Sequence, residues 1–82
     1  MTVNELRQLY RQQGIHEAEI IHDAVLPGWI VEFRGEGGRL FELTDSFGLP
    51  LSFGTVEEAR EHIHKVADCP IQVEHLYHFF ER

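Results

Sequence analysis

The chain has 82 residues, enough for one small domain, and its 43% hydrophobic content is typical of a globular protein rather than a disordered one. Its formal net charge of −7 disfavours nucleic acid as a partner, because phosphate binding needs clustered lysine and arginine. The single cysteine excludes an internal disulfide, and no apolar run approaches the roughly 20 residues of a membrane span. The first residues have no apolar stretch after a basic one, as a signal peptide would, so we expect a cytoplasmic, bacterial protein with no membrane partner.

The first segment is predicted to be a helix. Apolar side chains recur there at helical spacing, at Val3, Leu6, Leu9 and Tyr10. Thr2 and Glu5 have the spacing of a capping box, which marks the start of the helix. Gly14 is expected to occupy the position just after its last turn, where a left-handed backbone favours glycine.

Three or four strands are expected to follow as an antiparallel meander. The segment EAEIIHDAV is rich in residues that favour strands, and WIVEFRG alternates, with Trp29, Val31 and Phe33 on one face. The glycines of GEGG predict a hairpin loop before the strand RLFELTD. DSFG predicts a tight turn, and LPLSF a short strand in which Pro50 must lie at an edge or at the first residue.

A second helix and a closing strand complete the predicted fold. Thr55 and Glu58 fit another capping box, and the apolar stripe of the helix is Val56, Ala59, Ile63 and Val66. The tail fits either a strand or a helix, and we expect a strand from about residue 71 to 75. Residues 1–82 are therefore predicted to form a single α+β domain, with two helices covering one face of the sheet.

Candidate chemistry is sparse, and we predict no enzyme, cofactor or metal site. His62 and His64 are two residues apart, so on a helix they point in different directions. His75 and His78 could share a metal only in a helical tail, and a zinc site built from His62, Cys69 and His75 is the remaining alternative. Cys69 follows a helix C-terminus, where the helix dipole disfavours a thiolate, and it has no local signature of a nucleophile.

Aromatic side chains outside the predicted core are the candidate partner-binding residues. Phe47 occupies a turn position that is usually polar, so it either folds under the sheet or stands out as a contact residue. The tail places Tyr77, Phe79 and Phe80 so close together that one small core cannot enclose them all. Because large exposed apolar patches are rare on monomers, we expect a homodimer that also binds an unknown protein partner.

The stretch ELTDSFGLPLSFGTVEEAREHI resembles short uncharacterised proteins of bacterial plasmids and integrative elements. Their pattern L-T-D-x-x-G-x-P-x-x-F-x-T-x-E-x-A is matched by Leu43, Thr44, Asp45, Gly48, Pro50, Phe53, Thr55, Glu57 and Ala59. The segments ELRQLYRQQG and GWIVEF are similar to the same group. The resemblance implies a setting on bacterial mobile DNA and no particular activity.

The order of strands followed by FGTVEEA also resembles integrase arm-type DNA-binding folds, in which the sheet enters the major groove. Those domains carry arginine and lysine along the strands, whereas here Glu19, Glu32 and Glu42 accompany only Arg34 and Arg39. The favoured hypothesis is therefore a non-enzymatic protein-interaction or regulatory module. The alternatives are a nucleic-acid-binding module that uses the sheet face around Arg34 and Arg39, or an acidic nucleic-acid mimic that occupies a basic partner.

Overall fold

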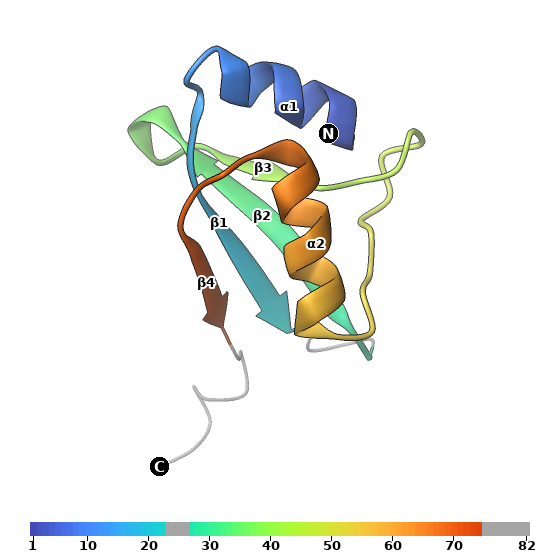
Figure 1. The fold of residues 1–82 in the computed structure, drawn as a ribbon. Helices are drawn as coiled ribbons and strands as arrows, with labels where there is room; N and C mark the ends of the chain where they lie inside the picture. Colours follow the sequence, from blue (N-terminus) through green and yellow to red (C-terminus); the bar gives the residue numbers. More distant parts are fainter. Residues whose placement is uncertain (23–26, 75–82) are drawn as a thin grey trace.

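The computed structural model describes residues 1–22 and 27–74, which form two α-helices, a short 3-10 helix and four strands (Figure 1). In chain order the elements are α1 (Val3–Arg11), β1 (Ile15–His22), β2 (Trp29–Gly35), η1 (Glu36–Gly38), β3 (Leu40–Glu42), α2 (Val56–Val66) and β4 (Ile71–Glu74). The predicted α+β class is confirmed.

The strands form one mixed sheet in the order β3-β2-β1-β4. The first three are an antiparallel meander, and β4 returns after α2 to lie parallel to β1. The expected hairpin at GEGG is confirmed, since η1 joins β2 to β3 there and Gly37 and Gly38 have positive φ angles. The closing strand is also confirmed, and its parallel pairing with β1 is a feature that the sequence pattern does not specify.

Both helices pack on the same face of the sheet. The side chains of Ala18, Ile20, Val31 and Phe33 are all completely buried and belong to one core with helix residues. The helices contribute Leu6 from α1 and Ala59, Ile63 and Val66 from α2. Because side chains alternate along a strand, the residues between these buried positions lie on the opposite face, which neither helix covers.

The helix starts form as the capping residues predict. The Thr2 hydroxyl accepts a hydrogen bond from the Glu5 amide at 3.3 Å, and the Glu5 carboxylate accepts from the Thr2 amide at 2.9 Å. At α2 the Thr55 hydroxyl accepts from the Glu58 amide at 3.1 Å. In a full capping box the Glu58 carboxylate would also accept a hydrogen bond from the Thr55 amide. Here that carboxylate instead lies 3.5 Å from the Thr55 hydroxyl, which donates to it.

Two local predictions are wrong. LPLSF does not form a strand, because Pro50 and Phe53 make only isolated bridges, to Thr44 and Trp29 respectively. The left-handed residue after α1 is Gln13, with φ of 62°, and not Gly14. Gly14 is required for a different reason, since a Cβ atom there would lie 2.6 Å from the Leu9 side chain.

Candidate functional site

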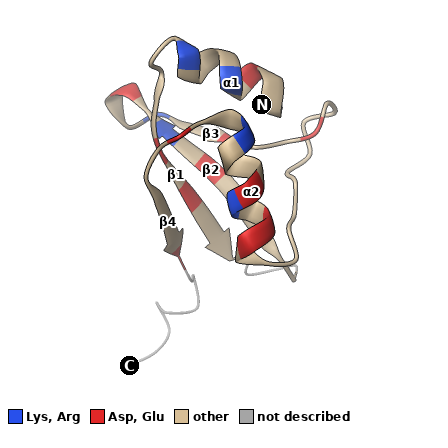
Figure 2. Ribbon diagram, in the orientation of Figure 1, with Lys and Arg blue, Asp and Glu red and all other residues tan. Residues whose placement is uncertain are grey.

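The sheet face that no described helix covers, called here the open face, is lined mainly by glutamates. Its residues are Glu17, Glu19 and Ile21 of β1, Ile30, Glu32 and Arg34 of β2, Leu40 and Glu42 of β3, and Gln72 and Glu74 of β4. Acidic positions recur along the strands in Figure 2. Among the described residues, Arg34 is the only cation on this face.

Strand register brings three of these glutamates into one row. Glu19 pairs with Glu32 across β1 and β2, and Glu32 pairs with Glu42 across β2 and β3. Neighbouring strands lie about 4.8 Å apart, so the carboxylates are held close together on one surface. Like charges in direct cross-strand pairs destabilise a sheet, so this row is not an arrangement that folding alone favours.

Arg34 neutralises one end of the row. Its Nη2 atom donates to Glu19 Oε1 at 3.0 Å, and the Glu19 residue is 5% exposed. A buried carboxylate needs such a partner, because an unpaired one would lose its hydration without compensation. The guanidinium is therefore engaged by a neighbouring strand, although 42% of the Arg34 side chain is exposed. Burial, and then the charges of Glu42 and Glu19, raise the pKa of the Glu32 carboxyl above its usual range.

Glu74 extends the acidic group to β4. Its carboxyl forms a hydrogen bond with the Glu19 side chain, which is the main cause of a raised pKa for Glu74. Burial and the charge of Glu19 act in the same direction, and Arg34 opposes them. The parallel pairing of β4 with β1 creates this contact between residues far apart in the sequence.

Arg34 and Arg39 do not form a common basic surface. Arg39 lies over the Phe41 ring, with the guanidinium carbon 5.2 Å from the ring centroid. Phe41 pairs with the buried Phe33 and so lies on the helix side of the sheet, whereas Arg34 lies on the open face. The two arginines proposed as a nucleic-acid contact thus belong to different faces.

Phe47 stands out from the molecule with 88% of its surface exposed. The loop that carries it, residues 45–49, is fixed by Asp45, whose carboxylate accepts from the Phe47 amide at 2.8 Å and the Leu49 amide at 3.0 Å. Gly48 provides the positive φ angle, 86°, that closes the turn. Of the two placements considered from the sequence, the structure therefore has the exposed one.

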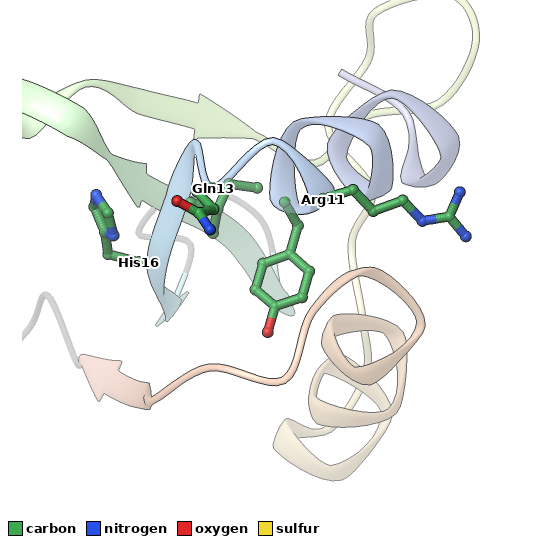
Figure 3. Close-up of a pocket in the computed structure, with 5 residues that line it drawn as sticks. Arg11, Gln13 and His16 are labelled. Atoms are coloured by element: carbon green, nitrogen blue, oxygen red, sulfur yellow. The ribbon is translucent and has the colours of Figure 1, made fainter.

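A depression of about 530 Å³ lies between the end of α1 and the start of β1 (Figure 3). Tyr10 and Ile15 give it an apolar floor, and Arg11, Gln13 and His16 line the rest of it. His16 Nε2 lies 3.8 Å from the Glu36 carboxylate. Nothing in the sequence pattern indicates this depression, because the helix-to-strand turn that shapes it depends on the left-handed Gln13.

The histidine, cysteine and acidic side chains within residues 1–22 and 27–74 form no metal-binding group. No three His, Cys, Asp or Glu side chains in those ranges are arranged to hold a metal ion. Burial and the charges of Asp68 and Glu17 raise the pKa of the Cys69 thiol, which disfavours the reactive thiolate. His62 Nδ1 lies 3.2 Å from the Glu58 carbonyl oxygen, and its ring packs against Phe53 with centroids 4.6 Å apart.

Several candidate residues lie outside the part of the chain that the structure describes. These are the aromatic residues of the tail, Tyr77, Phe79 and Phe80, and the histidines His75 and His78. The proposals that rest on them stay predictions.

No protein-family model, curated protein or solved structure matches the chain. Within the described residues, no helix is long and apolar enough to cross a membrane.

Proposed function

We propose that this protein is a non-enzymatic protein-interaction module whose open face binds a cationic segment of a partner protein. The observation that carries the proposal is the row formed by Glu42, Glu32 and Glu19, in register across β3, β2 and β1. The row lies on the face of the sheet opposite the helices, where Glu32 and Glu42 are partly exposed to a partner and Glu19 is buried beside Arg34.

Charge complementarity identifies the class of partner. Arg34 forms its ion pair with Glu19, and in the part of the chain that the structure describes no salt bridge joins a cation to the carboxyl groups of Glu32, Glu42 or Glu17. A lysine- or arginine-rich segment laid on the sheet would relieve the repulsion between them and donate hydrogen bonds to their carboxylate oxygens. Leu40, which is 52% exposed at the edge of the row, offers an apolar contact to the same segment.

A phosphate backbone is a poor ligand for this face, because it would add negative charge to an acidic surface. The acidic nucleic-acid mimic is a narrower form of the same proposal, in which the cationic partner is itself a nucleic-acid-binding protein. The setting that we propose, accessory or regulatory work for a mobile element in the bacterial cytoplasm, rests on the sequence resemblance alone.

The test is a fluorescence-anisotropy titration of a labelled lysine- and arginine-rich peptide. We expect salt-dependent binding that the double substitution Glu32→Gln and Glu42→Gln weakens by about tenfold or more, as loss of close charge pairs does. The matched control is Glu57→Gln with Glu61→Gln, which removes the same charge from exposed positions on α2 and should weaken binding far less.

Equal weakening by both double variants would contradict the proposal, since it would mean that the peptide responds only to net charge. Absence of binding at low salt would contradict it as well. A parallel titration with duplex DNA should give no binding. DNA binding that Arg34→Ala abolishes would instead support the nucleic-acid alternative.

A further inference from the structure

The outer edge of β4 presents main-chain groups that no described strand uses. β4 is an end strand of the sheet and pairs only with β1 among the described elements (Figure 1). The Ala18 amide donates to the Pro70 carbonyl oxygen at 2.9 Å, and this register turns the main-chain groups of Gln72 towards β1. Because these groups alternate in direction along a strand, those of Ile71 and Val73 point away from β1. An extended chain can therefore add to this edge.

The opposite edge of the sheet is closed. β3 has only three residues, Leu40–Glu42, and Met1 lies along its end. The Met1 nitrogen donates to the Glu42 carbonyl oxygen at 2.8 Å, and the Thr44 amide donates to the Met1 carbonyl oxygen at 2.8 Å. Proteins commonly blunt sheet edges, because an open edge pairs readily with another chain. Of the two edges, β4 is thus the one to which a partner strand can add.

The side chains of β4 determine what such a strand must carry. Ile71 and Val73 pair with the buried residues Ala18 and Ile20, so they lie on the helix side of the sheet, where they are only partly buried. Glu74 lies on the open face. A strand beside β4 would place alternate side chains on these two sides. Apolar side chains suit the helix side, and cationic ones suit the open face.

The edge is acidic at both ends. At the start of β4, burial and then the charges of Asp68 and Glu17 raise the pKa of the Cys69 thiol, which shows a negative potential there. At the other end lies Glu74, and no salt bridge joins it to a cation in the described part of the chain. A second copy is a poor occupant, because pairing β4 with β4 would bring two acidic edges together. A cationic strand has the complementary charge.

We propose that the outer edge of β4 binds an extended segment of a partner protein in which basic and apolar residues alternate, as a fifth strand of the sheet. Main-chain hydrogen bonds to Ile71 and Val73 supply affinity, and the alternating side chains supply specificity. The contact lies on the edge of the sheet and not on the row of Glu42, Glu32 and Glu19. It therefore goes beyond the proposed function and can fail independently of it.

The first test is a fluorescence-anisotropy titration with a labelled peptide in which lysine and valine alternate. Two further peptides carry N-methyl groups, one on the amides of its lysines and the other on the amides of its valines. In an extended chain these two sets of amides lie on opposite edges, so only one set can face β4. We expect one methylated peptide to bind about tenfold or more weakly and the other to bind like the parent, because N-methylation removes hydrogen bonds. Equal binding by the two methylated peptides would overturn the proposal.

The second test changes β4 itself. Val73→Pro removes an amide that points away from β1 and leaves the groups that face β1 in place. We expect the variant to keep its fold by circular dichroism and to lose about tenfold or more in affinity for the alternating peptide. The control is Glu32→Gln with Glu42→Gln, which should leave this affinity nearly unchanged at about 0.15 M salt, where distant charges are screened. Loss of affinity in the double variant but not in Val73→Pro would overturn this inference and support the proposed function.

A third measurement, amide hydrogen exchange followed by NMR, needs no variant. The amides of Ile71 and Val73 should exchange fast in the free protein and much more slowly with the alternating peptide bound, whereas the Gln72 amide should be protected in both states. Fast exchange of Ile71 and Val73 at saturating peptide would contradict the inference. Protection of these two amides in the free protein would overturn it as well, because another part of the chain or a second copy would then occupy the edge.

Discussion

Glu74 and Glu19 lie on neighbouring parallel strands, and their side chains are joined by a hydrogen bond. Two carboxyl groups can form that bond only if one of them carries a proton, and this raises the pKa of Glu74. The charged groups that face Glu74 are Glu19, Glu32 and Arg34, and only Arg34 favours ionisation. An ionised Glu74 is thus repelled by Glu19 and Glu32, and its charge opposes the pairing of β4 with β1.

The raised pKa of Glu74 determines how the stability of the folded protein changes with pH. A carboxyl group whose pKa is raised by folding stabilises the folded state fully below its ordinary pKa, and that stabilisation is lost as pH rises through the raised value. Glu32 acts in the same direction, because burial and Glu42 raise its pKa. Glu5 acts in the opposite direction, since its bonds to Thr2 lower its pKa.

Glu74→Gln should therefore stabilise the protein at neutral pH, because glutamine keeps a hydrogen-bond donor without the charge. The difference in unfolding free energy between variant and wild type should grow from mildly acidic to neutral pH, as measured by urea denaturation. Comparing the two proteins at each pH removes the opposing contribution of Glu5. The control is Glu61→Gln, at an exposed position on α2. The difference in unfolding free energy between this variant and the wild type should stay nearly constant with pH. A Glu74→Gln variant that is less stable than the wild type at neutral pH would show that the charge of Glu74 does not destabilise the folded state.

At the scale of elements, α2 depends on its first turn. The Thr55 hydroxyl satisfies the Glu58 amide, which would otherwise have no partner within the helix. Thr55→Ala should cost about 1 kcal/mol of stability, the usual cost of losing such a cap. In a domain of this size that lowers the melting temperature by roughly 4–8 °C, while Thr55→Ser should cost little.

Thr55→Ala also tests whether the start of α2 belongs to the scaffold or to the binding surface. Thr55 lies at the start of α2, on the helix side of the sheet, so Thr55→Ala should leave binding of a cationic peptide unchanged at temperatures where the protein is folded. Unchanged melting together with lost binding would contradict the assignment of this segment to the scaffold. Circular dichroism melting and the peptide titration provide the two measurements.

The elements themselves could be predicted because local chemistry specifies them. Alternation in WIVEFRG places Val31 and Phe33 in the core, and the Thr2 and Thr55 caps mark the helix starts. The segment LPLSF has a strand composition, but Pro50 has no amide hydrogen to donate, and the pairing there is reduced to isolated bridges. The sequence predicts a left-handed Gly14, but Gln13 takes that conformation, and Gly14 allows the close approach of Leu9.

At the scale of the whole molecule, the candidate site depends on relations between elements that no local pattern contains. The positions of Glu19, Glu32 and Glu42 on strands could be predicted, but their alignment in one row depends on the register of three strands. Glu74 joins them only because β4 pairs in parallel with β1. The exposure of Phe47 and the depression beside Tyr10 likewise result from how the turns set the elements in space.

The central claim, that the open face is the surface that binds a cationic segment, is tested most directly by mapping the bound peptide with two-dimensional NMR. On addition of a lysine- and arginine-rich peptide, the largest shifts should occur in the side-chain carboxyl and neighbouring amide signals of Glu19, Glu32 and Glu42. The amides of exposed α2 residues such as Arg60 should stay in place. Shifts concentrated on α2, or spread evenly over all acidic residues of the protein, would contradict the account.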